Sequence, residues 1–356
     1  MTGANNLRNY IFFFCGTLLL AGCNSTAGFL STNPVSTTAA PGSLPSSTPA
    51  HVTQPSIYVT QYDWKPWSVM IFPITANGWG EPPIEIPGSQ VSVDGAGNIY
   101  VVVLSNVQQY AVTSIDVYSP DLPNGKPIRS LPVGPGTKIT NVTSMVAGVT
   151  GEIFVSDGKG IAVFGPTATG NADPTRYILG TSHSASGESA AIRPGVIAVD
   201  NADNLYVQNL ADASIAVFEP ADTGTVVPSR TIAGPLTQIT GPWYTSMATD
   251  SQGNLYVLCP CGPNNGLNPF GVIEFGPSAN GNVAPMRYVT TPGLNTEYEG
   301  TGIAVDSAGT IYVMASVILN HGAVFEFPAT ASGSVTPSRT LTYSTWWESM
   351  GTIAVH

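Results

Sequence analysis

A short apolar motif, an aliphatic residue followed by an aromatic residue and valine, recurs six times along the 356-residue chain. Its copies are Ile57-Tyr58-Val59, Ile99-Tyr100-Val101, Ile153-Phe154-Val155, Leu205-Tyr206-Val207, Leu255-Tyr256-Val257 and Ile311-Tyr312-Val313. Successive copies begin 42, 54, 52, 50 and 56 residues apart. A repeat of roughly 40 to 50 residues is typical of propellers and solenoids. It constrains the architecture, whereas function has to be inferred from the loops, because propellers carry many unrelated activities.

Each copy belongs to a longer unit with four apolar runs, which is clearest over residues 197–232. The runs are short, rich in β-branched and aromatic residues, and bounded by Gly, Pro, Asn or Asp, which is typical of strands. Four strands make one propeller blade. The sequence therefore predicts an all-β fold over residues 56–356, a six-bladed β-propeller of four-stranded blades.

The two ends of this region complement each other. The chain ends in Ile353-Ala354-Val355-His356, which matches the first strand of a unit, such as Ile303-Ala304-Val305-Asp306. It begins at Ser56-Ile57-Tyr58-Val59, which matches a second strand and has no first strand before it. We therefore expect the C-terminal strand to pair into the first blade and close the ring.

An Asp-initiated turn joins the first and second strands at residues 94–98, 200–204, 250–254 and 306–310. Asp bonds to its own backbone and Gly accepts a positive φ, so these segments predict tight turns. A calcium loop of the EF-hand type is the alternative, but it needs carboxylates at alternating positions over twelve residues. The tight turn is the favoured interpretation.

A Pro-x-Arg motif begins the fourth strand of five units. Its copies are Pro127/Arg129, Pro174/Arg176, Pro228/Arg230, Pro285/Arg287 and Pro337/Arg339. Proline and a charged side chain on an outermost strand discourage edge-to-edge aggregation. We interpret these arginines as structural rather than as a phosphate or nucleic-acid site.

The I-A-V-D-x-x-G-N-x-Y-V core of the unit resembles NHL-repeat propellers and, more loosely, six-bladed sugar-lactonase-type proteins of the SMP-30 kind. The resemblance covers residues 56–356 and departs from the pattern at Gly148 and His356, where the repeat Asp is missing. Lactonases of this type hold a divalent ion such as calcium in the central channel through Glu, Asn and Asp. The resemblance implies that Asp157, Asn209, Glu299 and Asn320 could approach the channel mouth.

Nothing in the spacing of those four residues singles out a metal set, and only four histidines are present. The chain contains no nucleophile elbow, P-loop or H-E-x-x-H motif. The sequence therefore predicts no catalytic residue, no metal ligand and no cofactor. A metal-dependent lactonase or lyase remains the alternative to a binding protein.

Residues 1–22 have the layout of a secretory signal: one basic residue, Arg8, then an apolar run that includes residues 11–14, then small residues. Leu20-Ala21-Gly22-Cys23 resembles the bacterial lipobox, which implies cleavage before Cys23 and lipidation of its sulfur. An ordinary secretory signal is the alternative. Residues 23–55, rich in Ser, Thr and Pro, lack charged side chains and predict a disordered tether to the propeller.

The lipobox resemblance implies a bacterial envelope protein that is anchored to the membrane by lipid. Asn24 after the cysteine implies sorting to the outer membrane, facing the periplasm or the exterior. We expect a monomeric propeller.

The formal charge of the chain is −11, and only 9% of its residues are charged. Phosphate attraction supplies most non-specific nucleic-acid affinity, so we expect no nucleic-acid partner. Cys259 and Cys261 lie in one loop, where they could close a small disulfide or contribute to a metal site that would need further ligands. A local structural role is favoured.

Aromatic side chains collect in the connections on one side of the predicted disc, with amide and carboxylate neighbours. The candidate binding residues are Trp64, Trp67, Tyr110, Trp243, Tyr244, Glu297, Tyr298, Glu299, Trp346 and Trp347. Such a surface suits a glycan, a peptide or an envelope protein, although the same rings could instead pack loop on loop. Trp79 is expected on the opposite side. The sequence therefore favours an envelope binding or scaffold protein.

Overall fold

The computed structural model describes residues 55–61, 67–105, 111–121, 125–183, 189–239, 246–260, 270–291, 298–317, 321–344 and 351–356. The chain divides into two units, residues 1–46 and 47–356, and every described residue belongs to the second. The predicted signal peptide, Cys23 and nearly all of the predicted tether lie outside the described residues.

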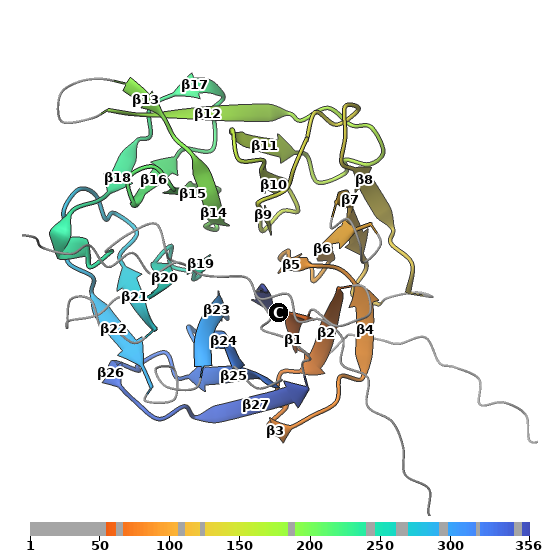
Figure 1. Ribbon diagram of the computed structural model, residues 1–356, viewed down its shortest axis with the longest axis vertical. Coiled ribbons are helices and arrows are strands. Elements are labelled where there is room, and N and C mark those ends of the chain that lie inside the picture. Colours follow the sequence, from red (N-terminus) through yellow and green to blue (C-terminus); the bar gives the residue numbers. More distant parts are fainter. Residues whose placement is uncertain are drawn as a thin grey trace, which may run out of the picture. The chain divides into compact units, whose positions relative to one another are not determined.

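Six antiparallel sheets form a ring, which confirms the predicted six-bladed β-propeller (Figure 1). In order from the axis outward, the strands of blades 1 to 3 are β28 (Ile353–Val355), β1 (Ser56–Gln61), β2 (Ser68–Pro73) and β4 (Ile84–Pro87); β5 (Gln90–Val93), β6 (Ile99–Leu104), β7 (Val112–Tyr118) and β8 (Arg129–Pro132); and β9 (Ser144–Ala147), β10 (Ile153–Ser156), β11 (Ile161–Phe164) and β12 (Arg176–His183).

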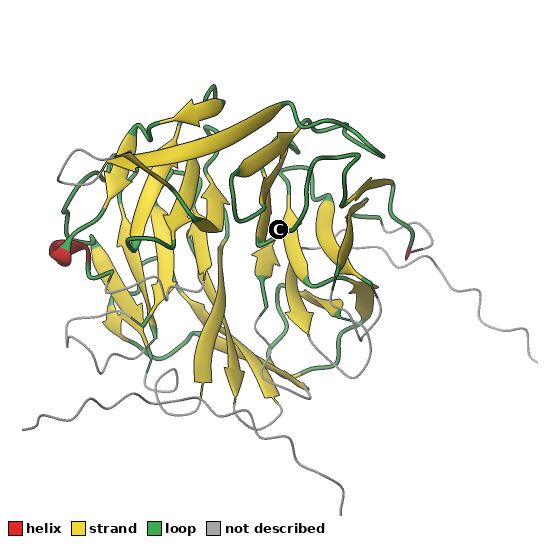
Figure 2. Cartoon of the chain, turned by 45° about the horizontal axis from the view of Figure 1, so that its top comes forward, coloured by secondary structure: helices red, strands yellow, loops and turns green. Residues whose placement is uncertain are grey.

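Those of blades 4 to 6 are β14 (Pro194–Val199), β15 (Leu205–Asn209), β16 (Ser214–Phe218) and β18 (Arg230–Ile232); β19 (Ser246–Thr249), β20 (Leu255–Cys259), β21 (Gly271–Phe275) and β22 (Arg287–Thr290); and β23 (Tyr298–Val305), β24 (Ile311–Val317), β25 (His321–Phe327) and β27 (Arg339–Ser344). A short strand, β13 (Ser189–Ala191), pairs antiparallel with the C-terminal end of β12. The described part of the chain is almost free of helix, apart from the 3-10 turn η2 (Pro235–Thr237) (Figure 2). No helix among the described residues is long and apolar enough to cross a membrane.

The C-terminal strand completes blade 1, as predicted. Strand β28 pairs antiparallel with β1, with Val355 opposite Ile57 and Ile353 opposite Val59. Ser56 and His356 exchange two backbone hydrogen bonds, of 2.7 and 3.1 Å. The first blade is therefore built from both ends of the propeller.

The hydrophobic core lies between blades rather than at one centre. One cluster joins Tyr100 and Ile115 of blade 2 to Ile153 and Phe164 of blade 3, and five similar clusters fill the other junctions. Because both faces of each sheet are buried, its strands read as continuous apolar runs rather than as alternating ones. This explains why the recurring tripeptide is apolar at all three positions.

Segments from one blade cover the outer edge of the preceding blade. The segment between the third and fourth strands supplies a short parallel partner: β3 (Gly78–Trp79) pairs with β27, β17 (Gly224–Val226) with β12, and β26 (Gly333–Ser334) with β22. A single parallel bridge joins Gly281 to Ile232, and the amide of Gly170 donates to the carbonyl of Ser130. The outermost strands of blades 2 to 6 are therefore not the open edges that the sequence suggested.

The repeated arginines fasten these segments. The guanidinium of Arg287 lies 5.9 Å from the Tyr256 ring of its own blade. It also donates to the carbonyl oxygens of Ala329 and Ala331 in the next blade, at 2.5 and 2.7 Å. Equivalent stacking is made by Arg129, Arg176 and Arg230. Their structural role is as expected, but they join neighbouring blades through hydrogen bonds rather than prevent edge-to-edge aggregation.

Candidate ligand site at the mouth of the central channel

We call the side that carries the Asp-initiated turns the turn face, and the opposite side the loop face. On the turn face the carboxylate of Asp94 accepts four hydrogen bonds. Its Oδ1 accepts the amides of Ala96 and Asn98 at 2.9 Å, and its Oδ2 accepts Asn98 Nδ2 at 2.7 Å and the Tyr100 hydroxyl at 2.9 Å. Asp200 and Asp250 repeat this pattern. These are tight turns whose carboxylate oxygens bond to the turn itself and to the tyrosine.

Those carboxylates also act on the tyrosines. Burial raises the pKa of Tyr256, and the charges of Glu274 and Asp250 raise it further. Burial and the charge of Asp94 raise the pKa of Tyr100 in the same direction. Each tyrosine is therefore held as a neutral hydrogen-bond donor in the interior of the turn face.

Blade 3 departs from the pattern, as the sequence indicated at Gly148. Phe154 replaces the tyrosine, so neither partner of the carboxylate–hydroxyl bond is present. Asp203 of the next blade lies in this place, and a Cβ on Gly148 would meet its Oδ1 at 3.3 Å. Burial is the largest cause that raises the pKa of Asp203, followed by the charge of Glu152.

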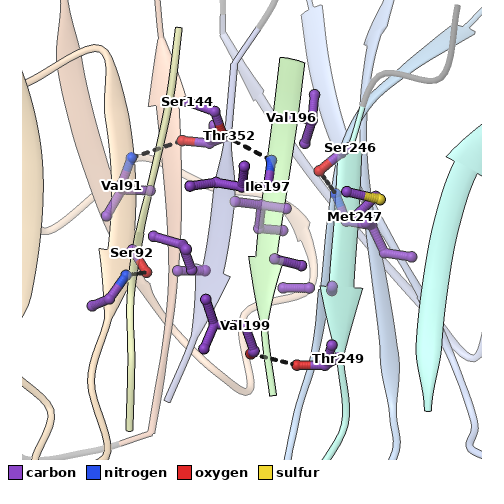
Figure 3. Close-up of a pocket in the computed structure, with 18 of the residues that line it drawn as sticks. Val91, Ser92, Ser144, Val196, Ile197, Val199, Ser246, Met247, Thr249 and Thr352 are labelled. Carbon is purple, nitrogen blue, oxygen red and sulfur yellow. Dashed lines mark hydrogen bonds between the residues drawn. The ribbon is translucent and has the colours of Figure 1, made fainter. Parts of the chain in front are cut away.

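The axis of the ring is a narrow channel of about 190 Å³ lined by the six innermost strands (Figure 3). Its lining consists of Val, Ile, Ala, Met, Ser and Thr side chains. At the turn-face end of the channel, two hydroxyls form hydrogen bonds between neighbouring blades. Ser92 Oγ accepts the amide of Ala147 at 3.0 Å, and Thr249 Oγ1 donates to the carbonyl of Val199 at 2.8 Å. The described channel wall offers no carboxylate and no imidazole.

Toward the loop face the channel opens into a wider mouth of about 490 Å³. The mouth shares Ser144, Val196, Ser246 and Thr352 with the channel, so the two cavities are continuous. Its remaining described lining is Trp67, Ser89, Gln90, Leu104, Val112, Asn141, Val142, Thr143, Thr301 and Gly351. This wall combines an indole, side-chain amides and hydroxyls, and none of its described residues is charged. All six blades contribute to it.

Of the sequence-predicted binding residues, Trp67 is the one that the structure places in the mouth. Tyr298 and Glu299 begin β23 of blade 6, and their side chains are not among those described. The other seven lie outside the described residues: Trp64, Tyr110, Trp243, Tyr244, Glu297, Trp346 and Trp347. Sequence reasoning missed Gln90, Ser144, Ser246 and Thr352.

Trp79 is not on the opposite face. It belongs to β3, which lies at the outer edge of the ring and pairs with β27. Its ring stands edge-on to that of His321, with centroids 5.1 Å apart, and the residue is 56% exposed. The difference arises because β3 leaves its own blade, blade 1, and pairs with the outermost strand of the preceding blade, blade 6.

Two of the residues implied by the lactonase resemblance have structural partners. The carboxylate of Asp157 accepts the amides of Lys159 and Gly160 and the hydroxyl of Tyr177. Asn209 is fully buried and bonds to the Asp212 carboxylate at 2.8 Å. Asn320 and the Glu299 side chain lie outside the described residues. Among the side chains that the structure describes, no group of three or more His, Cys, Asp or Glu residues could hold a metal ion.

Cys259 ends β20, is 3% exposed and is disulfide-bonded. Cys261, its sequence neighbour in the predicted pair, lies outside the described residues. The local structural role of the Cys259 and Cys261 pair therefore stays a prediction.

No protein-family model matches the chain, and no curated protein matches it. The resemblance to NHL-repeat proteins therefore stays a prediction. Solved structures do match. A protein of unknown function from Bacteroides caccae is 12% identical with a TM-score of 0.50, and the match covers 85% of this chain and 99% of that one. Apo AztD from Citrobacter koseri is 11% identical with a TM-score of 0.45, over 86% and 98%. At these identities the similarity is one of fold alone.

Proposed function

We propose that the protein is an exported, lipid-anchored propeller of the NHL-like type that binds a ligand at the mouth on its loop face. The ligand is a glycan, a peptide or an envelope protein. The observation that carries this proposal is the mouth itself, because its concave wall combines apolar side chains, among them the Trp67 indole, with uncharged polar groups, and ligand pockets use this combination. Its volume of about 490 Å³ also lies within the ordinary range for such pockets.

The sequence supports the location. Leu20-Ala21-Gly22-Cys23 resembles a lipobox, so Cys23 would carry the acyl chains and Asn24 would direct the protein to the outer membrane. The disulfide at Cys259 suits an oxidising compartment outside the cytoplasm. In this arrangement the predicted tether separates the propeller from the membrane.

Trp67→Ala tests the proposal. A tryptophan at the centre of an interface typically contributes 2 kcal/mol or more, so we expect binding to weaken by about 30-fold or more. Isothermal titration calorimetry of the full-length protein against neutral and charged oligosaccharides and short peptides measures this effect. A zwitterionic detergent should be used, since glycosidic detergents would compete for the site.

Trp79→Ala is the matched control, because it removes an exposed tryptophan from the rim rather than from the mouth. It should leave the affinity unchanged. Binding that survives Trp67→Ala and is lost in Trp79→Ala would place the site elsewhere. Hydrolysis of sugar lactones that stops on addition of a chelator would instead favour the enzyme alternative.

A further inference from the structure

We propose that the mouth binds an uncharged saccharide, and that hydroxyl groups of Ser144, Ser246 and Thr352 donate hydrogen bonds to it. This inference rests on the proposed function and names its ligand class. The three hydroxyls occupy the same repeat position, four residues before the place of the repeat Asp, in blades 3, 5 and 1. They therefore surround the axis on alternate blades, toward one end of the lining (Figure 3).

The oxygen of each of these hydroxyls accepts a hydrogen bond from a backbone amide of the next blade. Thr352 Oγ1 accepts the amide of Val91 at 2.7 Å, Ser144 Oγ accepts that of Ile197 at 3.3 Å, and Ser246 Oγ accepts that of Ile303 at 3.2 Å. A hydroxyl has one hydrogen to donate and two lone pairs. Within the described part of the chain none of the three hydrogens is donated to another residue. The mouth therefore presents three donors whose positions are fixed by the blades.

The side-chain amides of Gln90 and Asn141 supply further polar groups, and the Asn141 amide oxygen is the accessible acceptor. Gln90 occupies the same repeat position in blade 2; its Oε1 is buried without a hydrogen-bond partner among the described residues, so a ligand in the mouth can reach its Nε2 group rather than that oxygen. Its Nε2 makes one long contact, 3.4 Å, with the carbonyl of Thr143. Asn141 is exposed in the same wall. Sugar hydroxyls both donate and accept, so a saccharide can satisfy both sets of groups.

The neutral wall disfavours a charged ligand, since a buried charge needs a partner of opposite sign and the described lining offers none. A peptide that binds as an added strand is also disfavoured, because it needs unpaired backbone groups on a strand edge. The amides of Val91, Ile197 and Ile303 on the innermost strands are already bonded to hydroxyls. Side chains rather than open backbone are presented, and Trp67 adds a flat apolar surface against which a sugar ring can lie.

Ser144→Ala and Ser246→Ala test the inference by calorimetry on the full-length protein, with chitotetraose and cellotetraose as neutral probes. Tetragalacturonate serves as the charged probe and tetra-alanine as the peptide probe. A hydrogen bond between uncharged groups contributes about 0.5 to 1.5 kcal/mol, so each variant should weaken binding of the neutral saccharide about 3- to 10-fold. Ser92→Ala is the matched control, since its hydroxyl also accepts an amide across a blade junction but does not line the mouth.

Gln90→Met provides a second test that leaves every blade-to-blade hydroxyl bond in place, in case the serine variants do not fold. It should weaken binding about 3- to 10-fold with an unchanged melting temperature. Binding that needs Trp67 but is indifferent to Ser144, Ser246 and Gln90 would overturn the inference and leave the proposed function standing. Binding of the peptide or of the charged saccharide alone would do the same. Failure of every probe to bind would overturn the inference and leave an envelope protein as the ligand under the proposed function.

Discussion

The turn face and the mouth on the loop face use polar side chains in opposite ways. On the turn face, both oxygens of Asp94 are saturated by donors within the same turn and blade. At the mouth, the hydroxyls of Ser144 and Ser246 accept one bond each and donate their hydrogen to no other described residue. Residues that recur in nearly every blade hold the fold together, whereas residues that recur on alternate blades or not at all form the candidate site.

The largest effect on stability should come from removing the C-terminal strand that closes the ring. Deletion of residues 353–356 removes β28, its pairing with β1 and two side chains from the core, Ile353 and Ala354. We expect loss of cooperative unfolding, because the exposed second strand would leave two interblade clusters open. Thermal unfolding followed by circular dichroism measures this effect. His356→Ala, which keeps the strand, is the control, and an unchanged melting temperature in the deletion variant would refute the closure.

A single turn-face carboxylate should have the next largest effect. Asp250 is 7% exposed and accepts hydrogen bonds from Gln252, Asn254 and Tyr256. Bonds to a charged acceptor contribute about 1.5 to 3 kcal/mol each and are not additive, so Asp250→Ala should lower the free energy of unfolding by about 3 kcal/mol. Urea denaturation measures the change, and saccharide binding should be unaffected.

Asp173→Ala is the matched control for this variant. The Asp173 carboxylate pairs with Lys138 at 2.8 Å, but both side chains are more than 60% exposed. An exposed ion pair contributes at most about 1 kcal/mol. Equal losses in the two variants would mean that the saturated turns do not stabilise the fold as the comparison requires.

The sequence predicted the strands, the number of blades, the closure and the turns because each depends on a local pattern that recurs. It did not predict the segments that cover the outer edges, since β3 and β26 are two residues long and pair with a different blade. The sequence predicted a structural role for Arg287 but not its contact with the next blade, because the carbonyl partners lie more than 40 residues away.

The mouth was predicted only in part. Trp67 was a candidate because tryptophan is rare and chemically distinctive. Ser144, Ser246 and Thr352 were missed because single hydroxyl residues carry no signal in a chain rich in Ser and Thr. Aligning the blades on the repeat Asp would have revealed them, since hydroxyls and non-hydroxyl residues alternate at the position four residues before it.

The smallest effect on stability should come from blade 3, which lacks the Asp and Tyr that recur on the turn face. Beside Gly148, Asp203 Oδ1 is buried and has no hydrogen-bond partner among the described residues. Burial first, and then the charges of Glu152 and Asp200, raise the pKa of Asp203, while Arg176 lowers it. Because the folded-state pKa lies above the unfolded value, the folded protein binds this proton more tightly. The stabilising contribution is complete below the unfolded pKa, near 4, and disappears as the pH rises through the folded pKa.

Asp203→Asn should therefore raise the melting temperature at pH 7 slightly, by less than about 2 °C, and the advantage over the parent protein should vanish as the pH falls toward 4. Asn tolerates the positive φ of 61° at this position, so the backbone is not strained by the change. Differential scanning calorimetry between pH 4 and pH 7 measures the difference. If the substitution destabilises the protein at pH 7, the Asp203 carboxylate replaces the missing repeat Asp of blade 3, and saturation of polar groups extends to the whole turn face.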